Sequence, residues 1–491
     1  MQQSNSQKVL KGISSQTIVT LLIGIVEIGS FSIMSRLLSK DDFGYFAALI
    51  AVTSIFSALS ETGIGSAIVQ KKNPDNQFFN NAFTLSFLIG LILMALLCGF
   101  SGMIANLIVD NSIRLPLMII SCTLLLSCVT SVPRSILHKQ RMFYRMGLTK
   151  LFSLFFSTCV AICLALKGFG YYSILVRVVL DGLLVYLISL FLAKTQFHFA
   201  WNWIVIKKIF NFSGWLMAGS LFRNLANSVD SLIMPRLLSV TMLGAYNRPK
   251  GFINQISSQL NGIFDSALFP VLSEMQDDKD AIKNAYKTSV YFMNVFAMLL
   301  SLFFIFNGDL IIRIFFGEQW LNVRIIFVIL SVSLIMNIDG RLNDCYLRSL
   351  ALTKAQFVFR VAEFSVNLIF MVIGSKWGIV GFAIGCVCAN GLMTFAKMFY
   401  LNKKIFVSSF EIVKCIISSW SAGFVIIPLM ICIHAVMPNS FFGNLISCIC
   451  LFILFFIIFI FFPSIVGKKY KDNVYPKINE KLNQLIGRKT W

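Results

Sequence analysis

Long apolar stretches that follow one another along the chain are the feature that most limits its fold. Residues 452–462 read FILFFIIFIFF, and stretches nearly as apolar recur through the whole sequence. In lipid, a backbone without polar neighbours must satisfy its own hydrogen bonds, as a helix does. The alternating apolar and polar pattern of a membrane β-barrel does not occur in the sequence. We therefore predict an all-α, polytopic membrane protein.

Composition agrees with this prediction and excludes several other classes. The chain is 57% hydrophobic and 13% charged, whereas soluble proteins are about 45–50% apolar and about 25% charged. A net charge of +21 raises the question of nucleic acid, but the basic residues are scattered between apolar spans, so we expect no nucleic-acid partner. The twelve Cys and three His show no metal-ligand spacing, so we expect neither a metal site nor a cofactor.

Windows of about 20 apolar residues predict about fourteen transmembrane helices. Most basic residues then fall at the cytoplasmic ends of these spans, among them Lys139, Arg348 and Lys397. This bias requires an even number of spans and places both termini in the cytoplasm. The predicted spans lie near 13–35, 43–69, 81–109, 115–137, 147–166, 171–193, 213–236, 243–270, 288–307, 322–347, 355–375, 378–401, 411–436 and 441–466.

An internal repeat predicts how these spans are grouped. Met34–Lys40 reads MSRLLSK and Met234–Val240 reads MPRLLSV, 200 positions later, and Gly44 matches Gly244 at the same offset. A repeat of six spans gives two lobes of equal orientation with a cleft between them. The predicted parts are an N-lobe at 1–194, an interfacial amphipathic linker at 195–212, a C-lobe at 213–401, two appended spans at 402–466 and a basic cytoplasmic tail at 467–491.

Polar residues recur on single faces of several predicted spans. A charged group at the bilayer centre costs about 2.5–3.5 kcal/mol on insertion scales, so each needs a partner or water. We predict that these faces line a water-filled cavity; bonding between helices is the alternative, and we favour it for Arg177 and Asp181. The faces are Arg223, Asn227 and Asp230; Asn254, Ser258, Asn261 and Asp265; and Asn337, Arg341, Asp344 and Arg348.

The sequence offers little support for catalysis. It contains no GxxxxGK[ST] phosphate-binding loop and no catalytic pairing of Cys, His or carboxylates in a connecting segment. A membrane glycan polymerase is the competing enzyme class, and we expect such an enzyme to carry a large outer loop, which is missing here. We therefore predict that the protein is not an enzyme and has no catalytic residues.

The segment around the eighth predicted span resembles a known family. The matching residues are Leu243, Gly244, Tyr246, Phe269, Pro270, Leu272, Ser273, Gln276 and Asp278. Together with the layout of fourteen spans in two lobes, this pattern is similar to the Wzx-type exporters of O-antigen and colanic acid. These belong to the multidrug/oligosaccharidyl-lipid/polysaccharide (MOP) superfamily.

The resemblance implies a flippase in the bacterial inner membrane. It would move undecaprenyl-diphosphate-linked oligosaccharides between leaflets by alternating access for lipopolysaccharide or O-antigen biosynthesis, beside other polysaccharide-assembly membrane proteins. A cation-coupled multidrug (MATE-like) exporter is the alternative within the superfamily. Cationic and amide side chains suit a diphosphate. The substrate-binding candidates are Arg36, Arg134, Arg223, Asn227, Arg236, Arg248, Lys250, Asn254, Asn261 and Arg341.

Energy for transport must come from outside the chain. One charge moved across 100 mV is worth about 2.3 kcal/mol, so the membrane potential or a gradient of H⁺ or Na⁺ suffices as the expected driving force. Intramembrane carboxylates are the groups that bind such an ion. The ion-coupling candidates are Asp230, Glu363 and Glu27.

Overall fold

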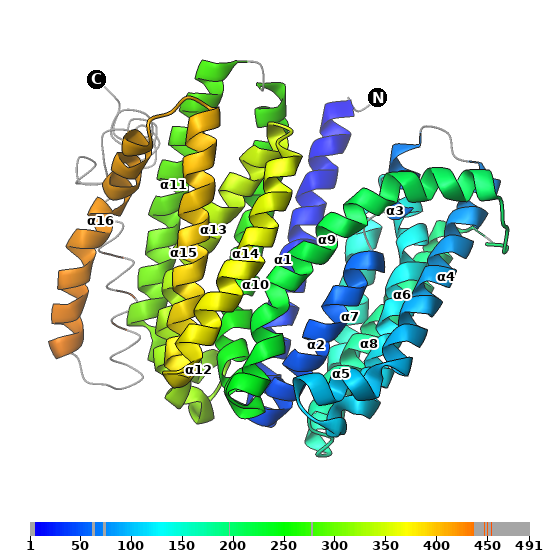
Figure 1. The fold of residues 1–491 in the computed structure, drawn as a ribbon, viewed down its shortest axis with the longest axis horizontal. Coiled ribbons are helices and arrows are strands. Elements are labelled where there is room, and N and C mark those ends of the chain that lie inside the picture. The colour runs from blue at the N-terminus through cyan, green and yellow to red at the C-terminus, as the bar shows by residue number, and fades with distance from the viewer. Residues whose placement is uncertain are drawn as a thin grey trace. The chain divides into compact units, whose positions relative to one another are not determined.

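The computed structural model describes residues 5–60, 64–71, 75–195, 197–275 and 278–436, with three isolated positions at 446, 449 and 453. Within these residues the chain forms helices and no strand (Figure 1). The elements are α1 (Asn5–Leu37), α2 (Lys40–Ser60), α3 (Ile64–Gln70), α4 (Asn76–Gly99), α5 (Ser101–Ile108), η1 (Asn111–Ile113), α6 (Arg114–Lys139), α7 (Phe143–Leu166), α8 (Tyr171–Ala193), α9 (Trp203–Leu237), α10 (Val240–Glu274), α11 (Lys279–Phe306), α12 (Gly308–Phe315), η2 (Glu318–Val323), α13 (Arg324–Ser349), α14 (Thr353–Ser375), α15 (Gly378–Lys404) and α16 (Ser409–Val436).

The long helices confirm the polytopic all-α prediction. Ten helices in the described part of the chain are long and apolar enough to cross a membrane. Three further long helices, α2, α9 and α10, also lie at predicted spans but are not among these ten. The predicted span at 441–466 and the basic tail at 467–491 fall outside the described stretches.

The turns between helices repeat along the chain. After α6, Arg141 adopts φ 58°, and after α13, Ala351 adopts φ 55°. The Arg141 N–H donates to the His138 carbonyl at 3.0 Å, and the Ala351 N–H donates to the Arg348 carbonyl at 3.1 Å. Both pairs are 210 positions apart, and the helices on either side have matching lengths and order. The turns at Arg141 and Ala351 are thus a second place at which the structure repeats, although the residue types at the two turns differ.

The MSRLLSK and MPRLLSV segments also form the same turn. The Leu38 N–H donates to the Met34 carbonyl at 3.0 Å, and the Leu238 N–H donates to the Met234 carbonyl at 2.9 Å. Ser39 and Ser239 then begin α2 and α10, since each hydroxyl accepts from the backbone three residues on, the usual role of an N-cap serine. The repeated sequence therefore encodes a helix end followed by a helix start.

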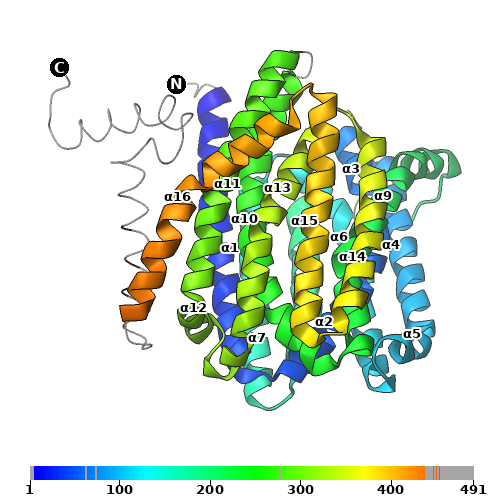
Figure 2. The same ribbon diagram turned by 60° about the vertical axis from the view of Figure 1, so that its left-hand side comes forward.

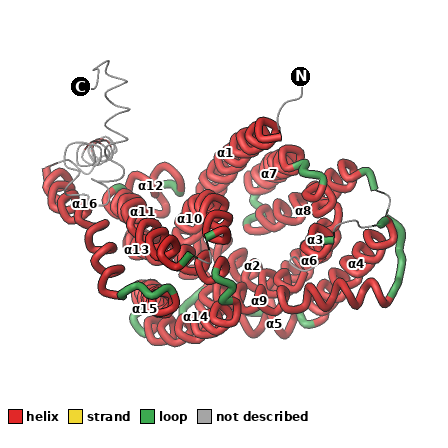
Figure 3. The backbone as a smooth tube through the Cα atoms, turned by 90° about the horizontal axis from the view of Figure 1, so that it is seen from above, coloured by secondary structure: helices red, strands yellow, loops and turns green. Residues whose placement is uncertain are grey.

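The described helices pack into two compact units. Unit 1 comprises residues 1–247 and 315–319, and unit 2 comprises 248–314 and 320–491. In unit 1, α6 and α7 both pack against α8, as the view along the helices shows (Figure 3). In unit 2, α15 packs against both α13 and α14, and α16 packs against α11 (Figure 2). α9 packs along α2 and belongs to unit 1, although most of it falls in the predicted C-lobe at 213–401. The lobe ranges predicted from the repeat stay a prediction.

The linker differs from the predicted interfacial helix at 195–212. Residues 197–202 are not helical, and α9 starts at Trp203 and continues without a break through the seventh predicted span. Alternate backbone N–H groups of the linker donate to polar side chains of α4: Ala200 to Thr84 Oγ1 at 3.0 Å and Asn202 to Asn81 Oδ1 at 2.6 Å. These side chains supply the acceptors that a helical turn would otherwise provide, so the segment lies along α4 instead.

Candidate functional site

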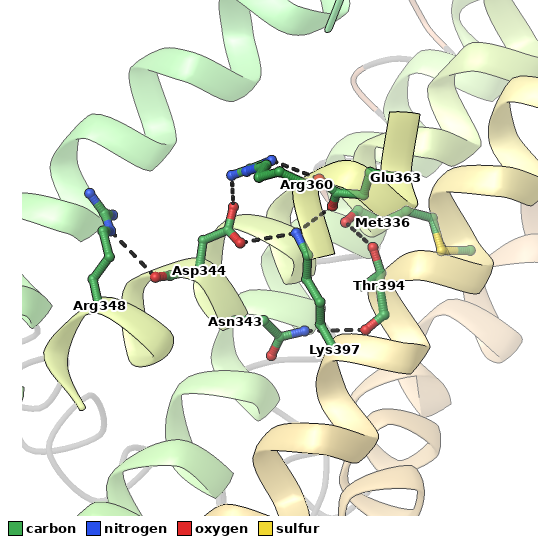
Figure 4. Close-up of polar contacts among 8 residues, drawn as sticks. All are labelled: Met336, Asn343, Asp344, Arg348, Arg360, Glu363, Thr394 and Lys397. Atoms are coloured by element: carbon green, nitrogen blue, oxygen red, sulfur yellow. Dashed lines mark hydrogen bonds and ion pairs between the residues drawn. The ribbon is translucent and has the colours of Figure 1, made fainter. Parts of the chain in front are cut away.

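Four charged side chains of unit 2 meet between three helices (Figure 4). Lys397 Nζ of α15 lies 3.0 Å from Asp344 Oδ1 of α13, and it also pairs with Glu363 of α14. Arg360 Nη1 lies 2.9 Å from Glu363 Oε2 one turn away on α14, and Arg360 also pairs with Asp344. Each acid thus contacts both cations, and we call these four residues the charge network.

Burial makes this pairing necessary. The side chain of Lys397 is 2% exposed and that of Asp344 is 6% exposed. A buried charge is tolerated when an opposite charge and further hydrogen bonds compensate for its lost hydration. Two acids and two bases give the charge network a formal charge of zero, so its primary effect is to hold α13, α14 and α15 together.

Further hydrogen bonds support the charge network on both sides. The Thr394 hydroxyl of α15 donates to the Met336 carbonyl of α13 at 3.2 Å, and Asn343 Nδ2 donates to the Thr394 carbonyl at 3.4 Å. Arg348 Nε donates to the Asp344 carbonyl at 3.3 Å. Figure 4 shows these bonds around Asp344 and Lys397. They fix the register of α13 against α15 at the level of the charges.

Lys397 has a role that the sequence analysis does not predict. The sequence places it among the basic residues at the cytoplasmic ends of the spans, which stays a prediction, and the structure shows that it is buried in the charge network. Its neighbours on the same face of α15, Thr394 and Leu401, are buried too. The sequence contains a signal for this burial: Lys397 lies three residues after Thr394 and four residues before Leu401. This spacing puts Lys397 on the packed face of the helix.

The remaining candidates of unit 2 are not members of the charge network, although Arg341 interacts electrostatically with Asp344. Arg341 on α13 and Asn254 on α10 are exposed, and Arg248 and Lys250 are partly exposed. Asn261 lies on α10, but its side chain is outside the described residues. The predicted face of the tenth span is therefore divided, because Arg341 and Arg348 are exposed while Asp344 packs inward.

The candidates of unit 1 divide in the same way. Asp230 is 1% exposed and accepts from the Ser231 N–H at 2.8 Å. Arg236 Nε donates to the Leu107 carbonyl at 3.2 Å, which joins α9 to α5. Four further candidates of unit 1 are exposed: Arg36 on α1, Arg134 on α6, and Arg223 and Asn227 on α9. That these exposed groups line a cavity stays a prediction.

Arg177 and Asp181 interact electrostatically with each other and also join α8 to neighbouring helices, as expected. Arg177 Nη1 of α8 donates to the Ser30 hydroxyl of α1 at 3.0 Å. Asp181 pairs with Lys150 of α7 at 2.5 Å and accepts from the Ser153 hydroxyl at 2.7 Å. Glu27, a predicted ion-coupling residue, interacts electrostatically with Arg177. It therefore belongs to this α1–α7–α8 contact.

The family pattern of the polysaccharide biosynthesis proteins (Polysacc_synt_3) matches residues 33–325, more than half of the chain. The chain belongs to this family. The matched region contains both copies of the repeated segment and the whole Leu243–Asp278 pattern. The sequence resemblance to polysaccharide exporters is thereby confirmed.

Relatives and solved structures agree with this assignment. The chain is 22% identical to the lipopolysaccharide biosynthesis protein WzxC of Escherichia coli K12 over 441 residues, which cover 87% of each chain. Its fold is similar to that of the lipid II flippase MurJ in an inward closed conformation, with a TM-score of 0.69, 16% identity and coverage of 90% of this chain and 98% of MurJ. It is also similar to an inward-facing multidrug resistance MATE transporter of the MOP superfamily, with a TM-score of 0.62, 15% identity and coverage of 79% and 94%.

Proposed function

We propose that the protein is a flippase that carries undecaprenyl-diphosphate-linked oligosaccharides from the cytoplasmic to the outer leaflet of the bacterial inner membrane by alternating access. Its product would feed surface polysaccharide assembly, and both of its termini would lie in the cytoplasm. The observation that carries this proposal is the family match over residues 33–325. No covalent bond of the substrate changes in such a step, so the proposed activity is transport and not catalysis.

The chemistry of the substrate fits exposed arginines within apolar helices. A diphosphate linked to sugars cannot enter hydrocarbon unaided, because its charges would lose their hydration. The forked guanidinium group pairs with two phosphate oxygens at once. Arg134 and Arg223 of unit 1 are exposed on helices at predicted spans. We propose that these two contribute to diphosphate binding.

A reconstituted vesicle assay tests the function directly. The purified protein is placed in vesicles that contain a fluorescent undecaprenyl-diphosphate sugar, and an impermeant quencher reports how much of the lipid reaches the outside. We expect protein-dependent transfer, slowed by Arg223→Ala and left unchanged by Lys403→Ala, an exposed lysine at the end of α15. Vesicles in which no lipid-linked sugar moves would reject the proposal.

The MATE-like fold supports a second candidate, a cation-coupled drug exporter. The likeness covers 79% of the chain with a TM-score of 0.62. The two candidates separate in the same vesicles, because a drug exporter expels a fluorescent organic cation and leaves the lipid-linked sugar in place. Expulsion of such a cation without lipid transfer would favour the exporter.

The driving force is part of the proposal. We propose the membrane potential or a gradient of H⁺ or Na⁺, with Asp230, Glu363 and Glu27 as the ion-coupling carboxylates predicted from the sequence. Glu363 contacts two cations in the charge network, which argues for a structural role beside any coupling role. Imposing each gradient in turn on the vesicles shows which one accelerates transfer.

A further inference from the structure

The carboxyl groups of unit 2 differ in how their charge is compensated. Asp344 and Glu363 each contact both Arg360 and Lys397. Asp339 lies on α13 within the span Glu318–Ser349 and accepts one hydrogen bond, from Asn294 Nδ2 of α11 at 2.7 Å. Among the described residues, no cation lies within ion-pair distance of Asp339.

The described residues on the helices around Asp339 supply no cation that contacts it. On α11, the Tyr286 phenol interacts electrostatically with Asp339 and donates a hydrogen bond to Asn343 Oδ1 at 2.8 Å. The cations facing α13 from α14 and α15 are those of the charge network, each held by two carboxylates. On α13 itself, Arg341 is exposed and Asp344 belongs to the charge network.

A carboxylate placed in a membrane span with only an amide donor is expensive to keep ionised. Loss of hydration favours its neutral form, and a neutral amide compensates for less of that loss than an ammonium or guanidinium group does. Binding one proton removes the charge without moving any helix. Asp344 and Glu363 have no such need, because their cations are already in place.

We propose that Asp339 is a proton-binding site of this transporter. The Asp339 carboxylate takes a proton from water to become the neutral acid and returns it to water when it ionises, with no other bond made or broken. The site differs from the three carboxyls that the sequence suggested for ion coupling. Its part in transport rests on the proposed function, whereas proton binding itself does not.

A hydrogen-bonded path connects this site to the first appended helix. Asn294 is fully buried on α11, and its Oδ1 accepts from Trp420 Nε1 of α16 at 3.2 Å. One amide therefore links Asp339 on α13 to Trp420 on α16. Protonation of Asp339 removes the acceptor charge from the Asn294 amide, so α16 is the helix placed to respond to the proton.

Infrared spectroscopy of the purified full-length protein tests proton binding without any lipid substrate. A protonated carboxyl has its own carbonyl stretching band, which disappears when the acid ionises. We expect wild-type protein at neutral pH to show this band and to lose it on alkalinisation, and we expect the band to be missing in both Asp339→Asn and Asp339→Ala. Asp309→Asn serves as the control, since a carboxylate oxygen of Asp309 lies 3.0 Å from Arg324 Nε in an ion pair; this variant should keep the band.

The outcomes of these experiments separate proton binding at Asp339 from the proposed flippase function. A band that persists in Asp339→Asn, or wild-type protein that shows no band, would overturn the assignment of Asp339. In Asn294→Leu we expect the band to shift in frequency, because the carboxyl loses its only described hydrogen-bond partner. A flippase assay that fails while the Asp339 band behaves as expected would reject the function and leave the proton site standing.

Discussion

A single polar residue in an apolar helix acquires its role from the residues it meets on other helices. Asp344, Arg360, Glu363 and Lys397 come from three helices and form one neutral charge network. Asp339, five residues before Asp344 on α13, accepts a hydrogen bond from the Asn294 amide and pairs with no cation among the described residues. Two carboxylates five residues apart on one helix therefore differ in how the described residues compensate their charge.

Removal of Lys397 tests the charge network. Lys397→Met leaves Asp344 and Glu363 sharing one cation, and breaking a buried ion pair in this way typically costs about 3–5 kcal/mol. We expect a clear fall in the apparent melting temperature of the detergent-solubilised protein. Lys403→Met, on the same helix but exposed, should melt like wild type. Equal melting of the two variants would contradict the network.

Acid stability depends in part on Asp110, in the connection before α6. Hydrogen bonds from the Ser112 hydroxyl and the Ser112 N–H, the latter at 2.8 Å, lower the pKa of Asp110, and the charge of Arg236 adds to the effect. A lowered folded-state pKa adds stability above the unfolded value of about 3.9, and this stability is lost as the pH falls through the folded value.

The corresponding variant is Asp110→Asn, which keeps a helix-capping side chain. We expect it to melt below wild type at neutral pH, with a small difference because Asp110 is exposed. The gap should narrow as the pH falls below about 4 and close once the pH is below the lowered folded-state pKa of Asp110. Melting curves recorded across the acid range measure it, and a gap that stays constant with pH would contradict the role of Asp110.

At the scale of elements, the two copies of the repeated segment meet each other. A Cβ placed on Gly44 would overlap the Val240 carbonyl oxygen, and one on Gly244 would overlap the Lys40 carbonyl oxygen. Lys40 and Val240 are themselves equivalent positions of the repeat, and the Thr241 hydroxyl donates a hydrogen bond to the Asp41 carboxylate across the same contact. The first turns of α2 and α10 thus cross reciprocally within unit 1, and glycine is required where they do.

Alanine substitution distinguishes these glycines from an ordinary one. Gly44→Ala forces the crossing apart, and overpacking of this kind costs about 1–3 kcal/mol. Gly29→Ala on α1 meets nothing within 4 Å, and removing a mid-helix glycine stabilises by up to about 1 kcal/mol. We therefore expect opposite shifts in melting temperature, and a Gly44→Ala variant as stable as Gly29→Ala would contradict the close crossing.

At the scale of the whole molecule, the sequence predicts how the chain is oriented in the membrane. The distribution of Lys and Arg predicts an even number of spans with both termini in the cytoplasm, and hence opposite sides for the connections at Asp110 and Gln140, which flank α6.

Reporter fusions measure this topology in living cells. We expect alkaline phosphatase fused after Asp110 to be active, because the predicted topology exports that connection, and the same enzyme fused after Gln140 to be inactive. A fluorescent protein that folds only in the cytoplasm should give the reverse pattern at the two sites. Activity of the phosphatase at Gln140 would reject the predicted orientation.

The sequence alone determined the features that depend on neighbouring residues. Apolar runs predicted the long helices, because a helix in lipid needs no partner for its backbone. The 200-residue repeat predicted that Met34–Lys40 and Met234–Val240 form the same turn. The Leu243–Asp278 pattern led to the family that the comparisons confirm.

The tertiary structure decided what depends on contacts between helices. Helical spacing gives the face of each side chain on its own helix but not which neighbour that face meets. For this reason the sequence does not show that Lys397 is buried in the charge network, and it predicts residues 197–202 as helix although α4 supplies their hydrogen-bond acceptors. The same limit hid the contrast between Asp339 and Asp344, since the compensation of a buried charge is a property of the packed unit.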